Sequence, residues 1–428
     1  MKHLHLLTVI FLFTACQHRP IHIVSEKYVD SLLQQTVIPV AYKQNAEEIK
    51  FWQQKIDPKN PGMVAELKYA SSLATRFNLT GDINDIKRSD SILHTINRTF
   101  KDKEAAPYLG LIRHAILQHK FLLADSFLQQ AQRIGIKPYE SSTTSFDVDF
   151  ELGRFYEAEQ ELKKITSNDY GYFFRFSKLA HYRSDVDTAI SSMQKALETA
   201  GTNLFLKQAA LSNLADLYLH NGQLEKAYAY YKESIQLSSA DLHSIMGIAW
   251  IALVHDKNTF LAEKLLAHVQ IKTKSPEPIY KLMYVAQAKG DSIKEMQYAK
   301  EFVLKVSDSV YGNMYNKYLI EIFTGVLNEP AKAEAIAKNE LLNRSTSQTY
   351  AWYVWALFKN NRYSEAYNVF QNHVSGKPLE GLELYWMGKV MKGLNKGYNA
   401  EQFFKEANKN KYDLSPVIIQ DLEKNLDH

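Results

Sequence analysis

Between about residue 60 and residue 415, apolar side chains recur every three or four positions, in stretches separated by short polar breaks. This period places the apolar side chains on one face of an α-helix. Glycine tolerates the positive φ that follows a helix end, so Gly81, Gly153, Gly222 and Gly290 are expected to mark turns between helices. The pattern therefore predicts an all-α chain of helices joined by tight turns.

The predicted helices fall into pairs that recur at a nearly constant interval. A small residue opens the second helix of most pairs, in the series Ala124, Ala158, Ala189, Ala227, Ala262, Glu295, Ala333, Ala366 and Ala400. The shortest interval of the series runs from Ala158 to Ala189, and none is longer than the next one, from Ala189 to Ala227. A single helix pair cannot bury both of its faces, so consecutive pairs must stack on one another. The sequence predicts an α-solenoid of about nine stacked helix pairs.

The best copy of the repeat begins at Gln208. Its core positions hold large and small side chains in a set order, with Leu211, Leu214, Ala215 and Tyr218 in the first helix and Ala227, Tyr231 and Ser234 in the second. This order resembles the tetratricopeptide repeat (TPR), and only Ser234 departs from it, because the family has alanine there. Small residues let the two helices of a pair approach closely, while aromatic ones fill the space toward the next pair.

The resemblance covers about residues 60 to 415 and includes an earlier unit through Leu73, Ala74, Phe77, Gly81 and Leu93. It implies a right-handed superhelix of TPR-like helix pairs, and we expect the repeat domain to occupy residues 43–424. The alternative is an irregular helical bundle in which the alanines and tyrosines recur by chance. Chance would not hold the spacing so constant over eight intervals, so the solenoid is favoured.

The N-terminus predicts export and a lipid anchor. An apolar run from Leu6 to Phe13 follows one lysine and two histidines, and it is too short to span a bilayer. The sequence Phe-Thr-Ala-Cys resembles the bacterial lipobox, which implies acylation of Cys16, although Phe13 stands where the family prefers Leu, Val or Ile. We therefore expect a signal peptide at residues 1–15 and a lipid-anchored tether at residues 16–42, where no helical period is sustained. The alternative is an ordinary signal peptide followed by a free cysteine.

The predicted location is the bacterial cell envelope, on the outer membrane and facing the periplasm. Cys16 is the only cysteine of the chain, so no intramolecular disulfide is possible. The residues after it lack the acidic run that marks surface-exported lipoproteins in some Gram-negative phyla, which favours the periplasmic orientation.

Charge and motifs argue against several functions. The 51 basic and 47 acidic side chains nearly cancel, so no nucleic-acid partner is expected. No His-Glu-x-x-His, Gly-x-Ser-x-Gly or phosphate-binding glycine motif is present. His114 and His119 are five residues apart and so point to different sides of a helix. We expect no catalytic residues, no metal and no cofactor.

In the family, ligands usually lie on a concave surface that is formed by the first helix of each pair. The corresponding positions of this chain are Phe174, Lys178, His181, Asp216, Tyr280, Tyr284, Trp355, Phe358, Tyr385, Lys389 and Lys392. Trp355 and Phe358 fit equally well as contacts between helices, whereas solvent or partner exposure is favoured for Lys389 and Lys392. The Lys/Asn clamp with which some members hold a carboxyl-terminal peptide is not reproduced, because Ser212 and Asp216 stand at its positions.

Two classes of function fit an anchored helical solenoid. The first is a non-catalytic scaffold or adaptor that binds a protein or peptide partner in the groove. The second is a glycan- or nutrient-capturing outer-membrane lipoprotein with TPR-like helices, but such proteins need long insertions for their ligand sites. The nearly constant intervals between pairs leave little room for insertions, so the scaffold is favoured. An enzyme would require a second domain, which the sequence does not indicate.

Overall fold

A computed structural model describes residues 22–34, 38–57, 59 and 62–427. All regular elements in these ranges are helices, as predicted. The expected signal peptide and Cys16 lie outside the described residues. Two helices, α1 (Glu26–Leu33) and α2 (Val40–Lys55), precede the repeat region, and α23 (Pro416–Leu426) follows it.

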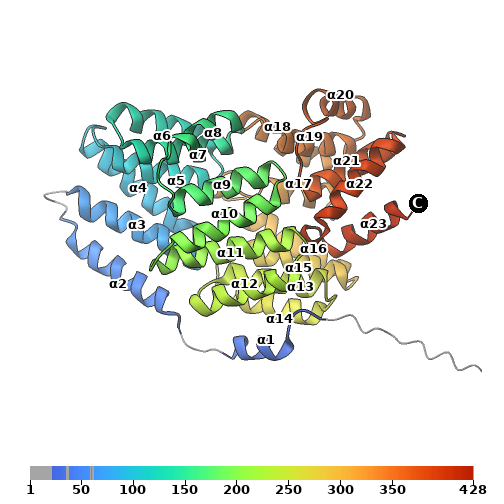
Figure 1. The fold of residues 1–428 in the computed structure, drawn as a ribbon, viewed down its shortest axis with the longest axis horizontal. Coiled ribbons are helices and arrows are strands. Elements are labelled where there is room, and N and C mark those ends of the chain that lie inside the picture. Colours follow the sequence, from blue (N-terminus) through green and yellow to red (C-terminus); the bar gives the residue numbers. More distant parts are fainter. Residues whose placement is uncertain (1–21, 35–37, 58, 60–61, 428) are drawn as a thin grey trace, which may run out of the picture.

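The repeat region consists of ten helix pairs that stack in chain order (Figure 1). The pairs are α3 (Met63–Thr80) with α4 (Ile83–Thr99), α5 (Ala105–Leu117) with α6 (Phe121–Ile134), α7 (Pro138–Glu151) with α8 (Phe155–Lys164), α9 (Tyr170–Tyr182) with α10 (Val186–Thr199), α11 (Leu204–His220) with α12 (Leu224–Leu237), α13 (Leu242–Val254) with α14 (Thr259–Gln270), α15 (Glu277–Ala288) with α16 (Ser292–Lys305), α17 (Asn316–Thr324) with α18 (Pro330–Asn343), α19 (Ser347–Lys359) with α20 (Tyr363–His373), and α21 (Gly381–Gly393) with α22 (Gly397–Lys409). Two 3₁₀ turns, η1 (Ser309–Tyr311) and η2 (Lys411–Asp413), lie in the loops before α17 and α23. The predicted solenoid is confirmed, and the earlier unit through Leu73 is its first pair.

Every pair has one left-handed residue in the turn between its helices. These residues are Gly81, His119, Gly153, Ser184, Gly222, Lys257, Gly290, Asn328, Asn361 and Asn395. The four predicted glycine turns are thus confirmed. In the other six pairs the left-handed residue is not glycine, and this backbone conformation costs such a residue roughly 1 kcal/mol or more. The residue five positions later is the buried alanine of the series in eight pairs, and it is Ile86 in α4 and Glu295 in α16. This constant offset confirms the alignment of the repeats.

The buried alanines set the distance between the helices of a pair. Ala227 is fully buried in α12, whereas Ala229 on the same helix is exposed. Replacing Ala227 by leucine is expected to lower the free energy of unfolding by about 1–3 kcal/mol, because the larger side chain overpacks the helix crossing. Ala229→Leu is the matched control and should change stability by less than about 0.5 kcal/mol. Urea denaturation of both variants measures the difference, and equal effects would contradict this role of Ala227.

The solenoid coils so that early turns meet loops about six pairs further along the chain (Figure 1). Lys274 N donates to Thr80 O at 2.7 Å, and Asn313 N donates to Gln118 O at 3.0 Å. Further along, the Asn410 side chain donates to His220 O at 3.0 Å. We name this line of contacts the seam; it joins the turns after α3, α5, α7 and α11 to the loops before α15, α17, α19 and α23. The coil is therefore closed rather than an open groove.

The segment before α2 differs from the prediction. Residues 16–42 were interpreted as a tether because no helical period is sustained there, whereas residues 22–34 pack as a short helical segment against α14. Ile23 N and Val24 N donate to the Asp256 carboxylate at 3.0 and 2.9 Å, and Val29 and Leu32 are buried. Eight helical residues with two buried apolar positions are too few for a recognisable period, which explains the error.

Asp256 fixes this N-terminal segment, since its side chain is only 1% exposed and accepts two backbone hydrogen bonds. In Asp256→Ala the segment is expected to detach, and a protease should cleave within residues 22–34 at least about tenfold faster, because each charge-assisted bond contributes roughly 1.5–3 kcal/mol. Asp30→Ala, which removes an exposed ion pair with Lys264, should leave the rate nearly unchanged. Limited proteolysis with mass spectrometry distinguishes the two outcomes.

Candidate functional site

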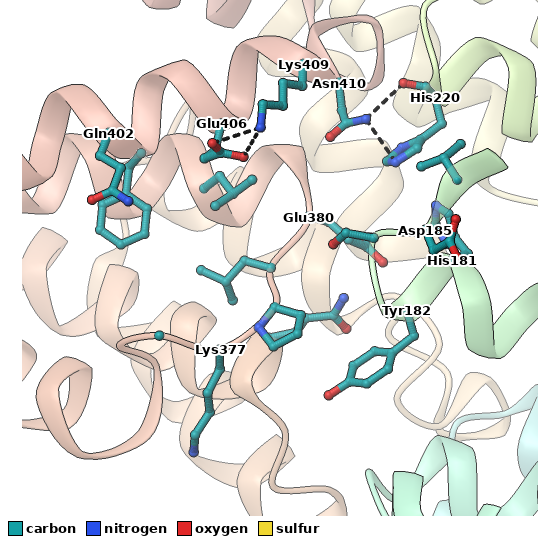
Figure 2. Close-up of a pocket in the computed structure, with 18 of the residues that line it drawn as sticks. His181, Tyr182, Asp185, His220, Lys377, Glu380, Gln402, Glu406, Lys409 and Asn410 are labelled. Atoms are coloured by element: carbon teal, nitrogen blue, oxygen red, sulfur yellow. Dashed lines mark hydrogen bonds and ion pairs between the residues drawn. The ribbon is translucent and has the colours of Figure 1, made fainter. Parts of the chain in front are cut away.

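The seam opens at the turn between α9 and α10. Four neighbouring turns meet their loops directly, but within the described residues no hydrogen bond or ion pair joins residues 183–185 to the loop before α21. A cavity of about 790 Å³ lies there instead (Figure 2). We name it the seam cleft; its polar lining includes His181, Tyr182, Asp185, Asp187, His220, Gln348, Lys377, Glu380, Gln402, Glu406, Lys409 and Asn410. These residues come from the fourth and fifth helix pairs and from the ninth and tenth, and they meet because the solenoid coils back on itself.

Glu380 lies at the N-cap of α21 and faces the cleft (Figure 2). Its side chain is 47% exposed, and its carboxylate is 3.7 Å from Lys317 Nζ. Lys317 also lies 2.8 Å from the buried carboxylate of Glu383. Burial opposes the ionisation of Glu380, but the charge of Lys317 and a hydrogen bond from Gln348 outweigh it and hold the pKa of Glu380 below its ordinary value. The wall at α21 therefore presents an ionised carboxylate.

Two histidines form the opposite wall of the cleft. The ring centroids of His181 and His220 are 4.6 Å apart in an edge-to-face arrangement. His220 Nδ1 lies 2.6 Å from Asp413 Oδ2, and its Nε2 lies 2.9 Å from Asn410 Nδ2. Both nitrogens of His220 are thus engaged, which orients the ring rather than leaving it open for proton transfer.

Their surroundings shift the pKa values of the two histidines in opposite directions. Burial lowers the pKa of His181, and the charge of His220 lowers it further. Burial also acts to lower the pKa of His220, but the hydrogen bond and charge of Asp413 outweigh it, so this pKa is raised. His181 is consequently neutral at neutral pH.

The structure brings only one of the predicted groove residues, His181, into the seam cleft. Phe174 is half-buried and stacks on Tyr170 with ring centroids 5.7 Å apart. Lys178 pairs with Glu151 at 2.5 Å. Both side chains contact their own solenoid, and their role in binding a partner stays a prediction.

Asp216 lies on α11, and Tyr280 and Tyr284 lie on α15; both helices pack against α13. The Asp216 carboxylate accepts from Tyr231 Oη at 2.6 Å and lies 2.9 Å from His243 Nε2, and this acid–histidine pair is partly exposed. Tyr280 and Tyr284 are buried, and both hydroxyls lie 2.5 Å from the Glu321 carboxylate. These side chains contact others of the same solenoid, and their role in binding a partner stays a prediction.

The pair of Asp216 and His243 predicts a pH-dependent contribution to stability. The charge of Asp216 is the main cause that raises the pKa of His243 to about 9, from an ordinary value of 6.5. Because the folded-state pKa is raised, the contribution is fully present below pH 6.5 and is lost as the pH rises through 9. An NMR titration of His243 should show a midpoint near 9 and, in Asp216→Asn, a midpoint near the ordinary value. The same midpoint in both proteins would contradict this pairing.

Trp355 and Phe358 pack between helices. Trp355 Nε1 donates to Thr324 Oγ1 at 2.9 Å, and its ring is stacked on Trp386 at 5.5 Å. Phe358 contacts α21 at Gly393, where an added Cβ would lie 2.4 Å from the ring. Of the two interpretations that the sequence left open, the structure favours contacts between helices.

The chain's own C-terminal helix covers the last group of predicted groove residues. Tyr385 Oη donates to Asp421 at 2.7 Å, and Lys389 Nζ lies 2.8 Å from the same carboxylate. Lys392 Nζ donates to Asn425 Oδ1 at 2.6 Å. Lys392 is exposed and Lys389 is partly exposed, while α23 provides an acceptor for each of them. Their role in binding a partner stays a prediction.

Sequence reasoning missed most of the seam cleft. Glu380, Asp185 and Lys409 lie far apart in the chain and on unrelated elements. Each looks like a helix-end or solvent-facing residue by itself, and no local signal reports the closure that brings them together. Within the described residues, no group of His, Cys, Asp and Glu side chains could hold a metal ion. No helix in the same ranges is long and apolar enough to cross a bilayer.

The repeat register and the packing can now be set beside known proteins. Residues 210–243, which include most of α11, the turn at Gly222 and all of α12, match the family model described as the tetratricopeptide repeat. The fold is a tetratricopeptide-type solenoid. This TPR match covers one pair, and the other pairs share its turn, its register and its stacking. None of the curated proteins matches the chain.

Several solved structures are similar to this TPR solenoid at low identity. A tetratricopeptide repeat protein from Parabacteroides merdae is 15% identical over 61% of this chain and 100% of its own, with a TM-score of 0.35. A structure described as the functional characterization of pilF of Pseudomonas aeruginosa is 12% identical over 50% of this chain and 97% of its own, with a TM-score of 0.36. A human IFIT1 dimer with PPP-AAAA is 11% identical over 77% of each chain, with a TM-score of 0.47.

Proposed function

We propose that this protein is a non-catalytic, lipid-anchored scaffold of the bacterial cell envelope that binds an extended segment of a protein partner in the seam cleft. TPR-type solenoids commonly act as protein-interaction scaffolds, and ligand sites are concave places with a few convergent polar groups. The observation that carries the proposal is the opening of the seam at the turn between α9 and α10, where a cavity of about 790 Å³ remains.

The cleft suits a peptide segment better than a reaction. The ring of His220 is held on both nitrogens, and the pKa of Glu380 is held below its ordinary value rather than raised toward neutrality. Its walls offer amide groups at Gln348, Gln402 and Asn410 beside apolar surface from Leu379 and Leu384. Such a mixture can satisfy a peptide backbone and contact its side chains at the same time.

A lipid anchor at Cys16 would place the protein beside the membrane. His22 is six residues beyond Cys16 (22 − 16 = 6), and an extended chain of six residues spans at most about 20 Å. Because residues 22–34 are fixed to α14, an acylated Cys16 would keep this side of the solenoid close to the bilayer. The proposed scaffold would therefore present its cleft at a set distance from the membrane.

The proposal is tested by blocking the cleft. Gln402 on α22 lines the cavity and is exposed, while the adjacent exposed Glu401 does not line it. Gln402→Trp should reduce the amount of partner that co-purifies with the full chain from membranes by at least about tenfold, whereas Glu401→Trp should leave it unchanged. Quantitative mass spectrometry of the two samples provides the comparison. Identical sets of co-purifying proteins would overturn the assignment of the cleft as the binding site.

A further inference from the structure

The seam cleft carries an excess of negative charge. Asp185, Asp187 and Glu380 contribute three carboxylates to its lining. Lys409 does not offset them, because it pairs with Glu406 at 2.7 Å. The remaining cation of the lining, Lys377, leaves an imbalance of about two negative charges (three carboxylates less one ammonium).

The other charged groups at the cleft already have partners of opposite charge or are neutral. Lys317 lies between two carboxylates, Glu380 at 3.7 Å and Glu383 at 2.8 Å, so this trio keeps one negative charge. His220 is paired with Asp413, and burial keeps His181 neutral at neutral pH. The imbalance is therefore not cancelled by a neighbouring cation.

Resting on the proposed function, we infer that the partner segment inserts an arginine or lysine side chain into the seam cleft, beside the half-exposed carboxylate of Glu380. A guanidinium or ammonium group supplies the positive charge that the lining lacks, and its N–H groups can donate to the carboxylates there. Its alkyl stem would contact Leu379, Leu384 and the ring of Tyr182, which line the same cavity (Figure 2). A segment with acidic side chains would meet repulsion from the three carboxylates.

The experiment uses the full chain in detergent and an array of random hexapeptides with blocked termini. The peptides retained by the protein should be enriched about tenfold or more in arginine and lysine over aspartate and glutamate. In Glu380→Gln, which keeps the size of the side chain, this enrichment should fall to about one. In the control Glu233→Gln, on the exposed face of α12, it should be unchanged.

Two other outcomes separate this inference from the proposed function. If Gln402→Trp abolishes peptide retention but the retained peptides show no preference for basic residues, the cleft binds peptides and the inferred partner chemistry is wrong. If Gln402→Trp has no effect on retention, the peptides bind elsewhere and both proposals fail. An enrichment in basic residues that survives Glu380→Gln would overturn the role given to this carboxylate.

Discussion

Gly312→Ala is expected to lower the free energy of unfolding by about 3 kcal/mol or more, although it adds a single methyl group. Gly312 has a φ of +58° in the loop before α17, where it contacts the turn after α5. A Cβ at this position would lie 2.3 Å from the carbonyl oxygen of Gln118, so the backbones of the seam must separate. The loss would combine the local strain of a side chain at φ +58° and ψ −127° with the separation of the early and late pairs.

Gly290→Ala is the comparison in which no close contact is made. Gly290 has a similar φ of +71°, but no atom lies within 4 Å of an added Cβ. Gly290→Ala should therefore lower the free energy of unfolding only by the cost of an alanine in a left-handed conformation, about 1 kcal/mol. Urea denaturation of both variants measures the two losses, and similar values would mean that the seam contributes little to stability.

Cys16→Ser is expected to move the protein almost completely from the membrane fraction to the soluble fraction. Each buried methylene of an acyl chain contributes about 0.8 kcal/mol, so several chains together hold a protein on a bilayer almost irreversibly. Cys16 is the only cysteine, so the substitution removes every thioether-linked anchor that this sequence offers. Cell fractionation with immunodetection measures the distribution.

The fold of the released Cys16→Ser protein serves as its control. Its helical circular dichroism and thermal transition should equal those of the anchored protein, because Cys16 precedes the packed segment that begins at Ile23. Continued association of the Cys16→Ser protein with membranes would remove lipidation from the account. It would leave the solenoid and the cleft unaffected.

The stacking of the helix pairs could be predicted because its signals are local. The residue five positions after each left-handed turn is small in eight of ten pairs, and its neighbours at helical spacing are apolar. Each of these features is confined to a single helix pair, so it can be recognised from the sequence alone. Leu211, Ala215 and Ala227 are buried as this register requires.

The closure of the coil could not be predicted in this way. The contact between Thr80 and Thr273 joins residues 193 positions apart, and the curvature that brings them together accumulates from small rotations between pairs. No single residue encodes that sum. For the same reason the predicted groove was placed along the first helices, whereas the cavity lies at the seam and shares only His181 with the prediction.

Site-specific photocrosslinking in intact cells tests the central claim, the binding of a partner in the seam cleft, most directly. A photoreactive amino acid in place of Gln402 lies in the cleft, and one in place of Leu304, which is 76% exposed on α16, lies outside it. The account predicts one discrete crosslinked product from position 402, its disappearance in Glu380→Arg, and no such product from position 304. Equal crosslinking from the two positions, or a product from position 402 that persists in Glu380→Arg, would contradict it.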